Sequence, residues 1–146
     1  MTWGRGDQAI SGLVILRSDS THKQYGAISV EIAGKPVDIW DMDLDTDGNP
    51  EIVLQVQLAN QLSDLYIYEF DRFGNAVPIR FPALSAKAMN GYKGKDNIYI
   101  KEGNLRRDFL FQDPNNKEAK AITRTLEYQL WNNLFYVKEI KEEQKK

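Results

Sequence analysis

The chain has 146 residues, of which 42% are apolar and 27% are charged, and its formal net charge is −2. These values are typical of one globular domain, and they argue against a protein that binds nucleic acid or a membrane surface through excess positive charge. The absence of cysteine and the single histidine, His22, exclude disulfides, thiolate zinc sites, cysteine nucleophiles and metal sites with several histidines from one chain. No apolar run approaches the roughly 20 residues of a membrane-spanning helix.

In chain order, we expect residues 1–12 to be a flexible N-terminus, residues 13–140 a single β domain and residues 141–146 a charged tail. Within the domain, short apolar segments with a period of two residues alternate with turn signals, as in antiparallel strands. The expected strands are residues 13–17, 27–32, 37–42, 54–58, 65–70, 77–81, 97–101, 105–111, 125–130 and 134–140. We expect a loop over residues 87–96.

A helix over residues 118–130 is the main alternative for the late segment. Thr123, Thr125 and Tyr128, together with the period-two apolar pattern, favour a strand there. The regular spacing of strands and turns therefore predicts an all-β fold, an antiparallel β-sandwich or barrel with short hairpins.

An acidic loop between two expected strands is the sharpest local signal. Alternate carboxylates followed by Gly48 match the opening of a calcium-binding loop, in which oxygens surround one cation and glycine permits the sharp turn. The predicted ligands are the side chains of Asp43, Asp45, Asp47 and Glu51 and the backbone carbonyl of Asn49. The flanks are strands and Leu54 stands where an EF-hand needs glutamate, so the loop resembles the strand–loop–strand calcium loops of integrin propellers instead.

A metal-free turn remains the alternative for this loop. Asp, Asn, Gly and Pro are also the residues that a tight strand connection needs without any ion. Repulsion among the aspartates requires compensation, which neighbouring lysine or arginine side chains would supply as well as calcium. A bound ion is expected to be structural, since an ion that binds only the folded state stabilises the fold.

Several stretches of the chain match one family in order and approximate spacing. They are residues 43–52, 81–84, 91–96 (Gly-Tyr-Lys-Gly-Lys-Asp), 102–109 (Glu-Gly-Asn-Leu-Arg-Arg-Asp-Phe) and 125–130 (Thr-Leu-Glu-Tyr-Gln-Leu). From residue 43 onward, the chain resembles the periplasmic inhibitors of invertebrate-type lysozyme found in Gram-negative bacteria. The resemblance implies a β-sandwich-like domain that is exported to the periplasm with its leader removed, is often dimeric and has no enzymatic activity.

The resemblance also implies a way of binding a protein partner, in which a loop enters the lysozyme cleft. The family's loop carries a Ser-Gly-x-x-Tyr motif, whereas residues 57–65, at the same place here, contain neither Ser-Gly nor tyrosine. Arg107 best fits the family's basic residue, with Arg106 beside it. The candidate partner-binding residues are Asn60, Gln61, Ser63, Asp64, Tyr92, Arg106 and Arg107.

Two functions follow from the sequence. The first is a non-enzymatic binding module outside the cytoplasm that resembles a lysozyme inhibitor. The alternative is a small β domain, stabilised by calcium, with a structural or interaction function. We expect no enzyme, since a catalytic site needs a positioned nucleophile or base and the sequence identifies neither. Calcium is the only cofactor expected.

Overall fold

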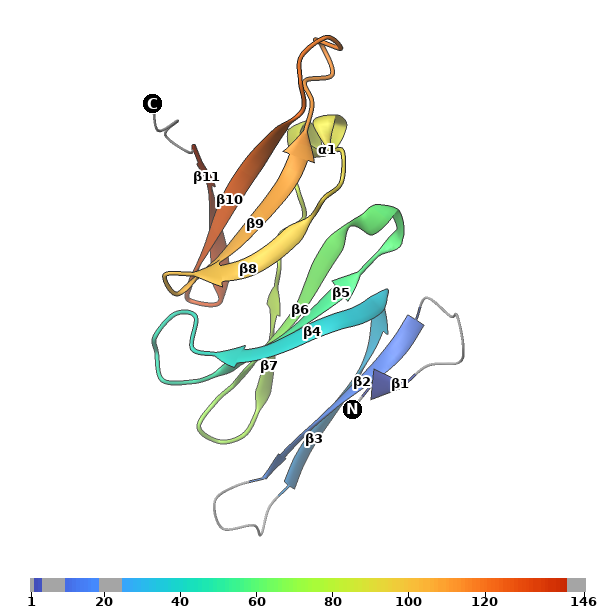
Figure 1. Cartoon of the computed structure of the whole chain (residues 1–146). Coiled ribbons are helices and arrows are strands. Elements are labelled where there is room, and N and C mark those ends of the chain that lie inside the picture. The colour runs from blue at the N-terminus through green and yellow to red at the C-terminus, as the bar shows by residue number, and fades with distance from the viewer. Residues whose placement is uncertain (1, 4–9, 19–24, 142–146) are drawn as a thin grey trace.

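Antiparallel β-strands make up most of this molecule, and the predicted all-β fold is confirmed. The structure is a computed structural model that describes residues 2–3, 10–18 and 25–141. Its described strands form three sheets (Figure 1). Sheet A contains β1 (Thr2–Trp3), β2 (Ile10–Ser18) and β3 (Tyr25–Ala33). Sheet B contains β4 (Lys35–Met42), β5 (Glu51–Gln57), β6 (Ser63–Phe70) and β7 (Ala76–Arg80).

Sheet C has the order β11-β10-β9-β8, so that each strand pairs with its neighbour in the chain. Its strands are β8 (Asn97–Lys101), β9 (Asn104–Phe111), β10 (Ile122–Trp131) and β11 (Leu134–Ile140). Two short helical segments, the 3-10 turn η1 (Ala59–Gln61) and α1 (Ala86–Gly91), lie in the connections.

Sheet B lies between the other two sheets (Figure 1). It shares one apolar core with sheet C, which includes Val53, Ile67 and Leu105, and a second, smaller core with sheet A. Leu54 on β5 belongs to the second core, next to Leu13 of β2. Strand β5 is thus covered on both faces, with Val53 in the first core and Leu54 and Val56 in the second. The predicted β-sandwich is present, and sheet A adds a third layer.

One sequence expectation needs correction, and in a second segment the expected strand is confirmed over its alternative. The expected loop over residues 87–96 begins with helix α1, because Ser85 accepts a hydrogen bond from the Ala88 amide at 3.2 Å and the next residues favour helix. The alternative helix over residues 118–130 is wrong, because most of that segment pairs with β9 and β11 as strand β10.

The expected flexible terminus, residues 1–12, is described only in part. Thr2, Trp3 and residues 10–12 belong to strands β1 and β2, while residues 1 and 4–9 lie outside the described residues. His22 and the tail beyond residue 141 lie outside them as well.

Two connections between strands depend on residues with positive φ values. Gly34, at a φ of +94°, takes the chain from β3 to β4, and a Cβ there would lie 2.7 Å from the Gln57 carbonyl oxygen. Asn132 and Asn133 join β10 to β11 with φ values of 48° and 58°. Asparagine tolerates this left-handed region better than most residues, which suits it to a tight hairpin turn. This turn carries the Asn133 side chain to Glu69 of sheet B.

Candidate functional site

The acidic loop connects β4 to β5, and its own carboxylates hold its shape. Asp43 accepts hydrogen bonds from the amides of Asp47, at 3.1 Å, and of Gly48, at 2.9 Å. Asp47 in turn accepts from the Asn49 amide at 2.7 Å. Thr46 and Gly48 have positive φ values, which close the turn. The loop therefore curls around its acidic side chains.

Four of the five predicted metal ligands come together in this loop. One carboxylate oxygen from each of Asp43, Asp45, Asp47 and Glu51 lies within 4.8 Å of the others. The fifth, Asn49, donates its side-chain amide to Asp47 at 3.2 Å, which leaves its backbone carbonyl as the atom the motif assigns to an ion. The ion pairs within the described residues all lie elsewhere, so no lysine or arginine among them neutralises this cluster.

Glu51 is the buried member of the cluster, with 0% of its surface exposed. Its Oε2 accepts a hydrogen bond from the Leu44 amide at 2.5 Å, but its Oε1 has no hydrogen-bond partner. Burial raises the pKa of Glu51 to about 7, and the carboxylates of Asp45 and Asp43 add to this effect. A buried carboxylate oxygen without a partner is costly, and a cation is one of the few groups that relieve the cost.

A second glutamate near the loop was not identified from the sequence. Glu69 on β6 lies directly opposite Glu51 in the β5–β6 register and is 7% exposed. Its Oε1 accepts a hydrogen bond from the Asn133 amide at 3.4 Å, while its Oε2 has no partner. Only a correct pairing register would have revealed it, since Glu69 is far from the loop in sequence.

The donor set of the loop fits a hard divalent cation. Calcium takes six to eight oxygen ligands in flexible geometry, and carboxylates and backbone carbonyls are the ligands it prefers. The loop offers these groups without a competing cationic side chain among the described residues. The geometry is therefore compatible with the predicted calcium ligands.

Two of the candidate partner-binding residues are buried, which corrects the sequence interpretation. Arg107 is 2% exposed and forms an ion pair with Asp96, with a contact of 2.7 Å from its Nε to Oδ1. It also donates to the Ser63 carbonyl at 3.0 Å, and the Ser63 amide donates to Asp96 at 2.7 Å. Because Arg107 and Ser63 join sheet C to the start of β6, they are not available to a partner.

The remaining candidates lie nearer the surface. Gln61 is exposed at the end of η1, and the Tyr92 hydroxyl donates to its carbonyl at 3.5 Å. Asp64 is half-buried, and burial raises its pKa. Arg106 pairs with Glu127 at 2.7 Å, as expected for the neighbour of an inward-pointing arginine. The side chain of Asn60 lies outside the described residues.

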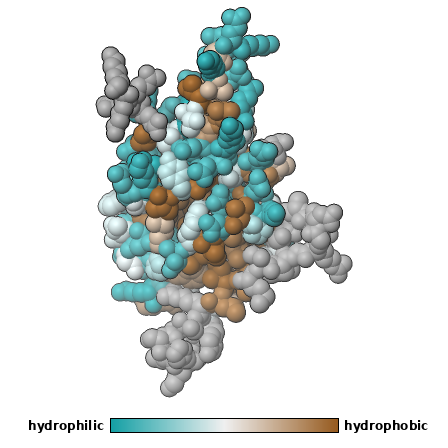
Figure 2. All heavy atoms as spheres, viewed as in Figure 1, coloured by the Kyte–Doolittle hydropathy of each residue, from teal (hydrophilic) through white to brown (hydrophobic). Residues whose placement is uncertain are grey.

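A groove of about 680 Å³ runs beside these candidates along β6 and β7. Its walls are mostly apolar and include Leu62, Tyr66, Phe81 and Met89. Figure 2 shows apolar residues over the middle of the molecule and hydrophilic residues at its upper tip. In Figure 1 this tip is the connection between β9 and β10.

Comparison of the chain with protein-family models, with curated proteins and with solved structures gave no match. Among the described residues, no helix is long and apolar enough to cross a membrane.

Proposed function

We propose that this domain is non-enzymatic and binds a calcium ion in the acidic loop between β4 and β5, where the ion stabilises the fold. The main support for this proposal is Glu51, which is fully buried, has one carboxylate oxygen without a partner and lies in one cluster with three aspartates. Four carboxylates this close repel one another unless a cation lies between them. The loop is thus costly when metal-free and favourable when loaded.

Thermal unfolding tests this proposal. The wild-type protein, freed of metal with a chelator, should melt at a higher temperature once calcium is added. At a calcium concentration of 100 times Kd, the expected gain in unfolding free energy is about 2.7 kcal/mol. Magnesium should give a smaller gain, since it demands stricter octahedral geometry.

A matched pair of variants gives the controls for this melting experiment. Asp45→Asn removes one cluster carboxylate and should reduce the calcium-induced shift. Asp41→Asn removes the same charge from an exposed side chain outside the cluster and should keep the shift. Equal melting temperatures in calcium and in chelator would contradict the proposal.

We also propose that the domain binds a protein partner, such as a lysozyme, as part of an inhibitor-like module in the periplasm. Support comes from residues of the matching stretches. Gly91 packs against the Phe111 ring, where a Cβ would lie 2.2 Å from a ring carbon, and Asp96 pairs with Arg107. The Arg107–Asp96 pair also bonds to the backbone of Ser63, in the segment over residues 57–65 that lines the apolar groove.

Enzyme assays with invertebrate-type, chicken-type and goose-type lysozymes test this second proposal. Inhibition of the invertebrate type that weakens in Gln61→Ala supports it, because Gln61 is exposed on that segment. If the protein inhibits none of the three lysozyme types, the proposal that its partner is a lysozyme is wrong. Size-exclusion chromatography of the same sample tests the expected homodimer.

A further inference from the structure

Two buried glutamates face each other across strands β5 and β6. Glu51 and Glu69 are directly paired in the antiparallel register, and both are more than nine-tenths buried. Each has one carboxylate oxygen without a hydrogen-bond partner. Like charges directly opposite each other destabilise a sheet, and burial makes the repulsion stronger. The pair therefore requires either a proton or a cation nearby.

Glu69 opens into the same space as the acidic loop. Together with Asp45 and Asp47, it lines a cavity of about 430 Å³. The other walls of this cavity come from the β10–β11 turn of sheet C and are Trp131, Asn132 and Asn133. None of these residues is cationic, and among the described residues the Glu69 side chain accepts a hydrogen bond from Asn133. Glu69, whose Oε2 has no hydrogen-bond partner, thus lines a cavity with acidic walls.

We propose that Glu69 is a further ligand of the bound cation, which it reaches from β6, outside the loop that supplies the other ligands. This inference rests on the proposed calcium site and extends it to a second strand. Asn133 then acts as a positioning residue, since its amide holds the other oxygen of the same carboxylate. The ion connects the acidic loop to sheet B and, through Asn133, to the turn of sheet C.

The electrostatic environment of Glu69 agrees with this role. Burial raises its pKa, and the nearby carboxylates of Asp47 and Asp45 raise it further. A divalent cation reverses this balance, because it favours the ionised form of every carboxylate around it. The carboxylate of Glu69 is therefore stabilised by the same ion that stabilises Glu51.

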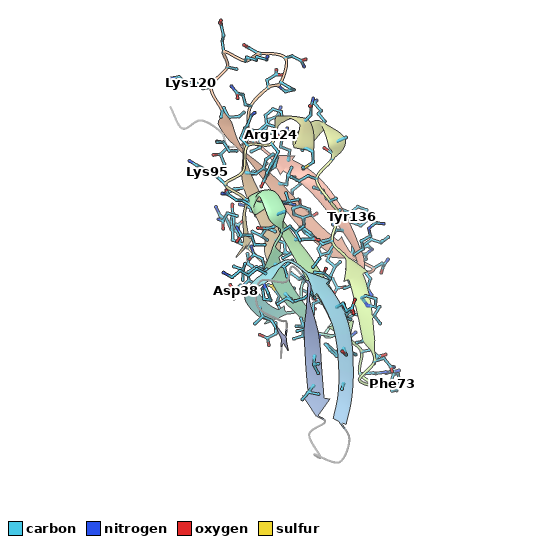
Figure 3. All side chains as sticks on the ribbon, turned by 90° about the vertical axis from the view of Figure 1, so that its right-hand side faces the viewer. Asp38, Phe73, Lys95, Lys120, Arg124 and Tyr136 are labelled. Atoms are coloured by element: carbon cyan, nitrogen blue, oxygen red, sulfur yellow. The ribbon has the colours of Figure 1, made fainter. Side chains whose placement is uncertain are left out.

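Calcium titration by isothermal calorimetry tests the role of Glu69. Glu69→Gln keeps the shape of the side chain and its bond to Asn133 but removes the charge. We expect it to raise the Kd for calcium by about tenfold or more. The matched control is Glu118→Gln, in the β9–β10 connection, which removes the same charge from an exposed side chain. That connection, marked by Lys120 in Figure 3, projects from the end of the molecule opposite Phe73.

Thermal melting of the same variants separates a ligand from a merely structural residue. In chelator, Glu69→Gln should melt at a higher temperature than the wild type, because the repulsion across the strands is relieved. Saturating calcium should shrink or reverse this difference. A merely structural role predicts the same difference in both conditions.

These experiments distinguish failure of the Glu69 inference from failure of the calcium site itself. If the wild-type protein binds no calcium, both fail. If the wild type binds calcium and Glu69→Gln binds it equally well, the inference fails while the calcium site stands. If Glu118→Gln lost as much calcium affinity as Glu69→Gln, the loss would come from the change in net charge and not from a lost ligand. That result would also overturn the inference.

Discussion

At the scale of single residues, the acidic site depends on two glutamates that the sequence presents very differently. Glu51 follows the aspartates at the spacing of a calcium loop, so its role as a ligand was predicted from the sequence. Glu69 has no such neighbours, and it enters the site only because β5 and β6 pair with these two residues opposite each other. Spacing along the chain predicts a local motif, whereas pairing across strands depends on register.

Glu51 also predicts an unusual pH dependence for the metal-free protein. Its pKa is about 7 in the fold, against 4.5 for an ordinary glutamate, so the folded state retains a proton that the unfolded chain releases between these values. The unfolding free energy that protonated Glu51 contributes is therefore lost as the pH rises from 4.5 through 7. The loss is at most about 3 kcal/mol, since one pKa unit corresponds to about 1.4 kcal/mol.

Chemical denaturation in chelator, at about pH 5 and about pH 8, measures this effect. Glu51→Gln accepts the Leu44 hydrogen bond without carrying a charge, so it should match the wild type at the lower pH and exceed it in stability at the higher pH. Identical pH profiles for the two proteins would show that Glu51 is not held in a costly environment.

At the scale of elements, the contact between sheets B and C depends on an ion pair. The side chains of Arg107 and Asp96 are 3% and 0% exposed, and both bond to the backbone of Ser63 at the start of β6. The two arginines are neighbours on β9, so their side chains point to opposite faces, and Arg107 is the one that points inward. The sequence did not indicate which one, because a partner for Arg107 more than ten residues away leaves no local pattern.

Arg107→Ala is therefore predicted to weaken the fold. Removing one partner leaves Asp96 buried and unpaired, which costs about 3–5 kcal/mol of unfolding free energy. Lys138→Ala is the control, since Lys138 is 55% exposed in its pair with Glu127 and such pairs contribute about 1 kcal/mol or less. Urea denaturation of both variants decides the matter. If both variants lost a similar, small amount of unfolding free energy, Arg107 would not hold sheets B and C together.

Several elements were predicted well and others were missed, for physical reasons. The β8–β9 and β10–β11 hairpins have strong turn residues between alternating strands, so their positions were predicted closely. Helix α1 has only six residues, too few to show a helical period, and its cap at Ser85 is the one local signal. The layering of sheet A was not predictable from a single strand, because periodicity does not indicate which sheet covers which face.

At the scale of the whole molecule, the proposed calcium site lies where sheets B and C meet. The acidic loop extends from sheet B toward the β10–β11 turn of sheet C (Figure 1). Residues of that turn line the cavity beside the loop. An ion there stabilises the folded state and not the unfolded chain, so its binding energy adds directly to folding. The apolar groove along β6 and β7 shares no lining residue with this cavity.

A crystal structure of the calcium-loaded protein is the measurement that tests this account most directly. We expect one strong electron-density peak in the acidic loop, about 2.3–2.6 Å from carboxylate oxygens of Asp43, Asp45, Asp47 and Glu51. A loop without such a peak in crystals grown in excess calcium, with Glu51 still buried, would contradict this account.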